Sequence, residues 1–334
     1  MLNKKTILIT GGSGSLGNAL CSYIIKNYKP KRLIIFSRDE LKQSEMRKIF
    51  SDTKYPFMRY FLGDVRDKDR LIEAFREVDI VVHGAALKQV PSGEYNPLEL
   101  IKTNINGAQN VIEACMKNNV KKVIALSTDK AANPINLYGA TKLASDKLFI
   151  AANNITGKNK CKFSIVRYGN VVNSRGSVVP IFQEFKKKDY FPITDKRMTR
   201  FWITLDQGVD FIIKNLKRMQ GGEIFVPKIP SIYVTDIAKS INPNKKLKII
   251  GIRPGEKLHE SMCSIDDNHL MIEFKDHYVI RPTIVIQKNI NYYKNLKGEV
   301  GKKVNKDFQY ISSENTKFLT IKEIQKSLKN LKSV

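Results

Sequence analysis

Two short segments carry the side chains that could perform acid–base chemistry. Thr128-Asp129-Lys130 places a hydroxyl, a carboxyl and an amine side by side, and Tyr138 and Lys142 follow at a helical spacing. Residues four apart share one face of a helix, and a nearby ammonium favours the phenolate form of a tyrosine. Tyr138 is therefore a candidate acid–base group. Tyrosine and lysine suffice for hydride transfer, whereas the added acid and amine predict that one substrate loses both a proton and a hydroxyl.

Short apolar segments alternate with helical patterns through the first half of the chain. We expect buried strands at residues 6–10, 32–36, 57–61, 80–83, 122–126 and 163–168. Helices are expected between them, for example over residues 96–118 and 138–154. Apolar strands separated by helices are typical of parallel sheets covered on both faces. The predicted fold class is α/β, with a Rossmann-type doubly wound parallel sheet that binds ligands at the carboxyl ends of its strands.

A glycine-rich turn follows the first expected strand and precedes a helix. Gly12, Gly14 and Gly17 have the spacing that lets the chain turn tightly, approach a pyrophosphate and pack a helix against the sheet. The amino terminus of that helix offers N–H donors and a partial positive charge to phosphate. The segment predicted to bind a dinucleotide comprises Gly11, Gly12, Ser13, Gly14, Ser15, Leu16 and Gly17.

The end of the second strand predicts which dinucleotide binds. The guanidinium of Arg38 suits a 2′-phosphate, so NADP is favoured over NAD, although Asp39 or Glu40 could still reach a ribose. Asp64 follows the third strand, either as a contact to the adenine or as a turn cap. Small residues after the fourth strand allow the cofactor to approach the backbone. The contacts expected here are Ser37, Arg38, Asp39, Glu40, Asp64, Val65, Ala85 and Ala86.

Turn signals become frequent after about residue 170, which indicates a smaller, partly discontinuous α/β substrate domain. We expect a nucleotide-binding domain over residues 1–170, to which residues 204–222 return as a helix. The substrate domain is expected over residues 171–203 and 223–290. Residues 291–334 form a basic C-terminal extension, with a helix-like stretch over 320–331.

Composition narrows the class of protein. The formal charge is +26, but lysines are spread along the chain, which favours a solvated basic surface over a specific nucleic-acid site. Such a surface attracts a diphosphate substrate, and the basic tail could weakly contact an acidic partner or a membrane surface. No apolar run approaches the length of a membrane span. Four scattered cysteines indicate a reducing cytoplasm, and neither they nor His259, His269 and His277 have metal-ligand spacing.

Several motifs together resemble a known family. Residues 128–134, 167–171, 197–201 and 253–257 match it, as do Tyr138 and Lys142. The chain resembles the extended short-chain dehydrogenase/reductase superfamily and, more closely, the inverting UDP-N-acetylglucosamine 4,6-dehydratases of pseudaminic acid synthesis. Retaining sugar-nucleotide dehydratases are similar but carry a glutamate where this chain has Lys130. This chain departs from the usual pattern at His83-Gly84, Ser92-Gly93 and Asn173, and His83 is most simply a core histidine.

The resemblance implies a catalytic role for each acid–base residue. Tyr138, with its pKa lowered by Lys142, would take the proton of the substrate's C4 hydroxyl, and Thr128 would bond to the forming carbonyl oxygen. Lys130 would then remove the C5 proton, and Asp129 would protonate the departing C6 hydroxyl. As a base Lys130 must be neutral, which we expect Lys142 and partial burial to favour.

The resemblance also implies a substrate, a cofactor and an assembly. Residues expected to contact UDP-N-acetylglucosamine are Lys88, Asn170, Val171, Arg175, Thr194, Met198, Arg253 and Glu256. Thr103 and Lys88 are expected beside NADP, together with Tyr138 and Lys142. Relatives of this kind form homo-oligomers, which suggests a hexamer. Two alternatives remain open: a sugar-nucleotide 4-epimerase of the same superfamily, and a non-catalytic NADP-binding protein.

Overall fold

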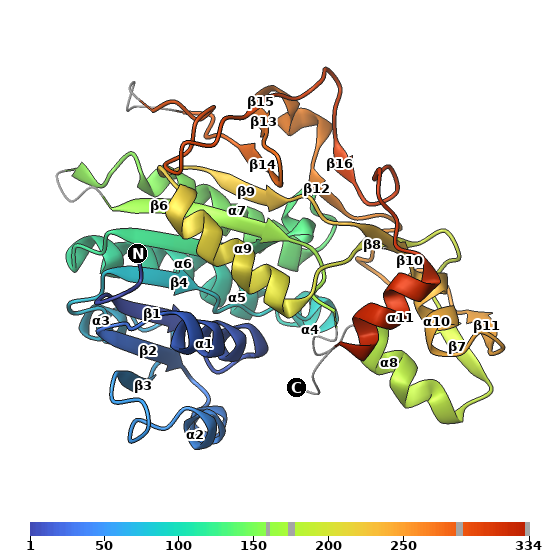
Figure 1. Ribbon diagram of the computed structural model, residues 1–334, viewed down its shortest axis with the longest axis horizontal. Helices are drawn as coiled ribbons and strands as arrows, with labels where there is room; N and C mark the ends of the chain where they lie inside the picture. The colour runs from blue at the N-terminus through green and yellow to red at the C-terminus, as the bar shows by residue number, and fades with distance from the viewer. Residues whose placement is uncertain (158–160, 173–177, 285–289, 331–334) are drawn as a thin grey trace.

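A ten-stranded sheet forms the centre of the molecule in the computed structural model, which describes residues 1–157, 161–172, 178–284 and 290–330 (Figure 1). Its strand order is β15-β13-β14-β9-β6-β5-β4-β1-β2-β3. Six strands from the first half of the chain form its parallel part: β1 (Thr6–Thr10), β2 (Arg32–Ser37), β3 (Met58–Leu62), β4 (Ile80–His83), β5 (Lys122–Thr128) and β6 (Lys162–Tyr168). The predicted doubly wound parallel sheet is confirmed.

Helices cover both faces of this sheet because its strands are apolar on both sides. Ile7 and Ile9 of β1 pack in one hydrophobic cluster with Leu20 of α1 and Ile212 of α9. The intervening Leu8 packs in the opposite cluster, together with helices α3, α6 and α7. Successive side chains of a strand point to opposite faces, which explains the alternation. The helices of these layers are α1 (Ser15–Asn27), α2 (Glu40–Ile49), α3 (Lys68–Ala74), α6 (Gly107–Lys117), α7 (Leu137–Ala152) and α9 (Leu205–Arg218).

The single helix predicted over residues 96–118 is divided in the structure. The chain forms α4 (Val90–Tyr95), α5 (Pro97–Leu100), a π-helical segment over Ile101–Asn106, and then α6. A proline is readily accommodated at the start of a helix, where its missing N–H is not needed. The π-helical segment buries Thr103 and Asn104, and π-helical turns are frequent at functional sites.

The sheet extends beyond the predicted boundary at residue 170. β9 (Ile224–Pro227) pairs in parallel with β6, and β14 (His277–Ile280), β13 (Met271–Glu273) and β15 (Lys302–Lys303) continue the sheet in antiparallel order. These strands lie in the ranges predicted for the substrate domain and the basic extension. All four residues of β9 are buried, so this short strand covers the edge that β6 would otherwise expose.

A third hydrophobic cluster forms a smaller lobe beside the carboxyl ends of the parallel strands. Its core includes Phe182, Phe191, Trp202 and Ile237, and Ile324 from the C-terminal helix. The indole N–H of Trp202 donates to Ser327, so the C-terminal helix completes this lobe. The remaining helices and strands are α8 (Val178–Glu184), β7 (Tyr190–Ile193), β8 (Thr199–Phe201), β10 (Ser231–Tyr233), α10 (Val234–Ile241), β11 (Lys246–Ile249), β12 (Ser261–Cys263), β16 (Tyr310–Ile311) and α11 (Ile321–Lys329).

None of the helices in the described ranges combines the length and the apolar character that crossing a bilayer requires.

Candidate active site

The glycine-rich turn is shaped to bring backbone close to a ligand. Gly11 has a φ of +66°, and a Cβ atom built on it would lie 2.9 Å from the backbone nitrogen of Ala85. A Cβ on Gly17 would lie 2.1 Å from the carbonyl oxygen of Gly12, so a side chain there would push α1 away from the turn. The helix begins at Ser15 and its first N–H groups face this turn. The turn therefore fits a dinucleotide pyrophosphate.

The acidic residues near the end of β2 are engaged by neighbouring groups. Asp39 caps α2 by accepting from the backbone N–H of Lys42, and it also pairs with the Lys42 amine. Asp64 forms an ion pair with Arg38 at 3.2 Å and accepts from the backbone of Arg66, as a turn cap does. Arg38 is half exposed at the cleft, whereas Glu40 is exposed and does not line it. Arg38 and Lys42 are therefore cations at this part of the cleft wall.

The loop after β4 is held by one buried asparagine. Asn104 accepts from the backbone N–H of Leu87 and donates to its carbonyl oxygen, both at 2.9 Å, and it also donates to Thr141 of α7. This fixes the loop that contains Ala85 and Ala86. The neighbouring Thr103 is buried, and Arg66 donates to its hydroxyl.

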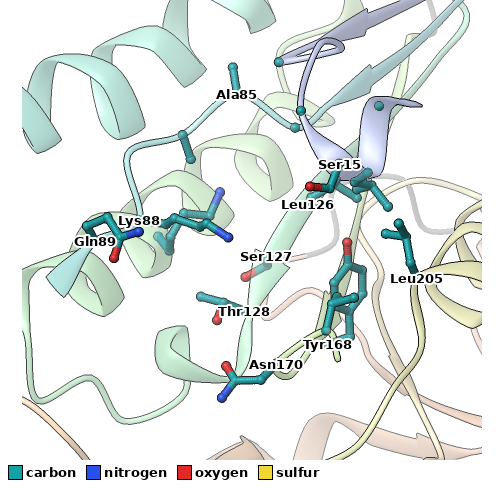
Figure 2. Close-up of a pocket in the computed structure, with 18 of the residues that line it drawn as sticks. Ser15, Ala85, Lys88, Gln89, Leu126, Ser127, Thr128, Tyr168, Asn170 and Leu205 are labelled. Carbon is teal, nitrogen blue, oxygen red and sulfur yellow. The ribbon is translucent and has the colours of Figure 1, made fainter. Parts of the chain in front are cut away.

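A cleft of about 1220 Å³ runs from the glycine turn to the smaller lobe. Its volume exceeds that of an ordinary single-ligand pocket and suits a dinucleotide together with a sugar nucleotide. Figure 2 shows Lys88 and Gln89 on the loop after β4, opposite Ser127 and Thr128 at the end of β5. Predicted residues that line the cleft are Gly11, Ser13, Gly14, Ser15, Leu16, Gly17, Ser37, Arg38, Asp39, Asp64, Val65, Ala85, Ala86, Lys88, Thr103, Thr128, Lys130, Tyr138, Lys142, Asn170, Val171, Arg253 and Glu256.

Tyr138 lies in the first turn of α7 and faces the end of β5. Burial raises the pKa of Tyr138 to about 12, while the charge of Lys130 and a hydrogen bond with Thr128 oppose the rise. The prediction that Lys142 is the cation acting on this phenol differs from the structure, in which Lys130 has the larger influence. The reason is that the helical spacing aligns Tyr138 and Lys142, but Lys142 lies next to Asp146, one turn further along the helix.

Lys142 belongs to a buried network with a single carboxylate. The hydroxyl of Ser127 donates to Asp146 at 2.6 Å, and the guanidinium of Arg167 pairs with the same oxygen at 3.1 Å. Burial lowers the pKa of Lys142, and the charge of Asp146 only partly opposes this. Burial and the charge of Lys142 together lower the pKa of His83 to about 3, so this core histidine is neutral.

Lys130 lies between two buried carboxylates. Its amine is 3.0 Å from Oδ1 of Asp129 and 3.1 Å from Oε1 of Glu260, and it donates to Asn170 at 3.1 Å. Burial disfavours its charge, but the two carboxylates outweigh burial and raise the pKa of Lys130. The expectation of a neutral Lys130 in the resting protein is therefore wrong. Asp129 and Glu260 act on it more strongly than any neighbouring cation, so it must give up a proton before it can act as a base.

Two segments that are distant in sequence, residues 132–136 and 253–257, meet at the cleft near this lysine. The Asn136 amide donates to the carbonyl oxygen of Gly255 at 2.8 Å, and the amine of Lys257 donates to Ala132. Arg253 forms a bidentate pair with Glu256, with both N–O distances at 3.0 Å. The motif at residues 253–257 is thereby held against the start of α7.

Some predicted residues do not line the cleft. Met198 is buried in the hydrophobic core of the smaller lobe, and Thr194 is buried outside the cleft wall. Gly12 and Asp129 lie behind the wall, Gly12 under the turn and Asp129 fully buried beneath Lys130. Arg175 and Asn173 fall outside the described residues. Within the described ranges, no three cysteine, histidine or acidic side chains gather as a metal site would require.

Comparison with known proteins defines the family. Residues 7–282 match the model of a family described as polysaccharide biosynthesis protein. The chain belongs to this family. It is 58% identical over 327 residues to a UDP-N-acetylglucosamine 4,6-dehydratase (inverting) of Campylobacter jejuni subsp. jejuni serotype O:2, covering 97% of each chain. The resemblance expected from the motifs is thus confirmed.

Some other relatives are less similar in sequence. A UDP-glucose 4-epimerase of Rickettsia bellii is 40% identical over 340 residues, with 99% of this chain and 97% of the relative covered. Among solved structures, Pen from Bacillus thuringiensis is 34% identical with a TM-score of 0.87, covering 99% of both chains. DesIV, a dTDP-glucose 4,6-dehydratase from Streptomyces venezuelae, is 20% identical with a TM-score of 0.66, covering 76% of this chain and 86% of DesIV, and supports the fold alone.

Sequence reasoning missed two carboxylates of this site. Asp146 lies one helical turn beyond Lys142, and this spacing could have indicated a partner for that lysine. Glu260 follows Lys257 and His259 in a segment without clear periodicity, far in sequence from Lys130. No local signal indicates that it would lie beside the amine.

Proposed function

We propose that this chain is an NADP-dependent, C5-inverting UDP-N-acetylglucosamine 4,6-dehydratase. It converts UDP-N-acetylglucosamine into UDP-2-acetamido-2,6-dideoxy-β-L-arabino-hex-4-ulose, an early intermediate of pseudaminic acid or a related surface sugar. The observation that carries the proposal is that Tyr138 and Lys130 line the same cleft, while Asp129 lies directly behind its wall, 3.0 Å from the Lys130 amine. An oxidation and an elimination can therefore take place on adjacent carbons of one substrate.

The first step is oxidation at C4. Tyr138 takes the proton of the C4 hydroxyl, and Thr128 donates to the oxygen as it becomes a carbonyl. The glycine turn and Arg38 would hold NADP, which when bound would supply a hydride acceptor for C4 and a hydride donor for C6. In the free protein burial keeps Tyr138 protonated, so its action as a base requires additional positive charge near the phenol.

The second step is loss of water across C5 and C6. The new C4 carbonyl makes the C5 hydrogen acidic, and the Lys130 amine removes it. Asp129 protonates the C6 hydroxyl as the C6–O bond breaks. A proton added to C5 from the opposite face inverts the configuration. In the overall count this proton replaces the one that Tyr138 took from the C4 hydroxyl, and the proton given to the C6 oxygen replaces the one taken from C5. Asp129 and Lys130 are adjacent in sequence and 3.0 Å apart, so acid and base act on neighbouring atoms.

The preference for NADP rests on Arg38 at the end of β2, since Asp39 is engaged as a helix cap. A homo-oligomer, such as a hexamer, stays a prediction that light scattering would test. A reducing cytoplasmic location also stays a prediction, supported by four cysteines that are all buried and unpaired.

The test is to incubate the purified protein and NADP with UDP-N-acetylglucosamine in deuterated water. The expected product has lost one water, carries deuterium at C5 and shows inverted C5 configuration by NMR. A product that keeps its water would contradict the proposal, as would a product with hydrogen retained at C5.

A sugar-nucleotide 4-epimerase is the second candidate, favoured by the similarity to the Rickettsia protein. An epimerase needs Tyr138 and Lys142 but no acid–amine pair. Mass spectrometry separates the two, because an epimer has the mass of its substrate.

A further inference from the structure

Two carboxylates share one lysine at the deep end of the cleft. Lys130 lies within 3.1 Å of oxygens from both Asp129 and Glu260. The proposed chemistry uses only Asp129 and Lys130, so Glu260 has no assigned task. It nevertheless lines the cleft and is only 2% exposed. A buried ionised carboxylate is costly unless it is paired, so its presence at this point needs an explanation.

The surroundings of the two carboxylates differ. Glu260 has a second cation nearby, because Nε of Arg200 lies 3.8 Å from it. Oδ1 of Asp129 accepts from the Thr128 hydroxyl and from Lys130. Each carboxylate also has one buried oxygen without a hydrogen-bond partner, Oδ2 of Asp129 and Oε2 of Glu260. The difference is therefore the second cation, which favours ionisation of Glu260 over that of Asp129.

The direction of the pKa shifts agrees with this division. Burial raises the pKa of Asp129, and the charge of Glu260 raises it further. For Glu260, burial is outweighed by the charges of Lys130 and Arg200, which lower the pKa of that carboxyl. When the environments of two neighbouring titratable groups move their pKa values apart, one group commonly acts as the acid and the other as the base.

Glu260 is also rigidly held. Its backbone N–H donates to the hydroxyl of Ser312 at 2.9 Å, and its carbonyl oxygen accepts from the Ser312 backbone at 2.8 Å. Ser312 is fully buried and its hydroxyl bonds to Thr199 at 2.7 Å. A fixed carboxylate at this distance can exchange a proton with the amine without rearrangement.

We propose that Glu260 holds the proton that Lys130 must give up before it can act as a base, and returns it after water has left. This inference rests on the proposed dehydratase function. Glu260 acts through Lys130 and is therefore a positioning residue.

The proton transfers balance over one cycle. The cycle begins with the acid form of Asp129, an ammonium on Lys130 and a carboxylate on Glu260. An N–H bond of Lys130 breaks and an O–H bond forms on Glu260, which leaves a neutral amine. Lys130 then takes the C5 hydrogen, and Asp129 gives its proton to the leaving C6 oxygen. Finally Lys130 passes a proton to Asp129 and receives one from Glu260, which restores the resting state.

The test compares Glu260→Gln with Glu260→Asp and with the wild-type protein. The amide keeps the shape but cannot accept the proton, whereas the shorter carboxylate can. In Glu260→Gln we expect water loss to fall by about 10²-fold, with C5 hydrogen exchange into deuterated water slowed to match. Oxidation at C4 should persist, seen as reduced nicotinamide absorbance that forms but does not decay. Glu260→Asp should recover part of the elimination rate.

A matched control is Glu223→Gln. Glu223 is also 2% exposed, but it lies outside the cleft and bonds to Ser164. This variant should eliminate water at the wild-type rate once its folding is verified by thermal denaturation. The inference would be overturned if the Glu260→Gln variant eliminated water at a rate within twofold of wild type. It would also be overturned if the rates of C4 oxidation and of water elimination fell by the same factor. Failure of the wild-type protein to release water would instead overturn the proposed function.

Discussion

Two lysines in one cleft have opposite electrostatic environments. One carboxylate, Asp146, acts on Lys142, and the same carboxylate pairs with Arg167. Burial lowers the pKa of Lys142. Lys130 is accompanied by two carboxylates, which raise its pKa despite burial. The two lysines differ in the number of neighbouring carboxylates, and Lys142 is also the more deeply buried of the two. The two lysines therefore suit different tasks, one beside the tyrosine and the nucleotide, the other at the eliminating carbons.

The strongest test of this division is the pair of variants Lys130→Ala and Lys142→Ala. Lys130→Ala should reduce water loss by about 10²–10⁴-fold, because it removes the amine proposed to take the C5 proton. Reduced nicotinamide should still form, and the dissociation constant for NADP should be unchanged by fluorescence titration. Lys142→Ala should prevent formation of reduced nicotinamide. If the two variants gave the same absorbance of reduced nicotinamide, Lys130 and Lys142 would not have the different tasks proposed for them.

The network around Lys142 should be the one that matters more for stability. Asp146→Asn leaves the Arg167 guanidinium, only 3% exposed, without its counter-charge. Breaking a buried ion pair from one side costs about 3–5 kcal/mol, measurable by urea denaturation. The control is Asp210→Asn, which removes a surface pair with Lys214 and should cost less than about 1 kcal/mol. Equal losses of unfolding free energy in the two variants would mean that the buried network does not contribute to stability.

A substitution at the nucleotide end of the cleft should change only the affinity for NADP. Arg38→Ala removes the cation expected to meet the 2′-phosphate. Loss of a hydrogen bond to a charged group, about 1.5–3 kcal/mol, predicts about 10–100-fold weaker NADP binding. Isothermal titration should show an unchanged affinity for NAD. An equal loss for both dinucleotides would contradict the assignment of Arg38.

The smallest expected effect is a pH dependence of stability from His83. Its pKa falls from 6.5 to about 3 in the folded protein because burial and Lys142 oppose its charge. Between these values the unfolded chain binds a proton that the folded chain does not, so stability decreases as pH falls. The slope from this one group is at most about 1.4 kcal/mol per pH unit. His83→Asn should flatten the curve of unfolding free energy against pH in this window, and an unchanged slope would exclude His83 as its source.

Local patterns were sufficient for the nucleotide-binding half of the fold. The strand bounds at Thr6–Thr10 and Ile80–His83 agree with the sequence expectation, because continuous apolar runs between turn residues are a short-range signal. The same patterns were insufficient beyond residue 170. β9, β13 and β14 are short strands whose place in the main sheet depends on pairing with β6 and with each other.

By itself the sequence determined the α/β class, the glycine turn and the adjacency of Asp129 and Lys130, since each depends on residues that are close along the chain. Only the tertiary structure decided that Glu260 and Arg200 would lie beside Lys130. The protonation state of that lysine follows from charges brought together by folding. Electrostatic energy depends on distance in space, so no local spacing could have predicted it.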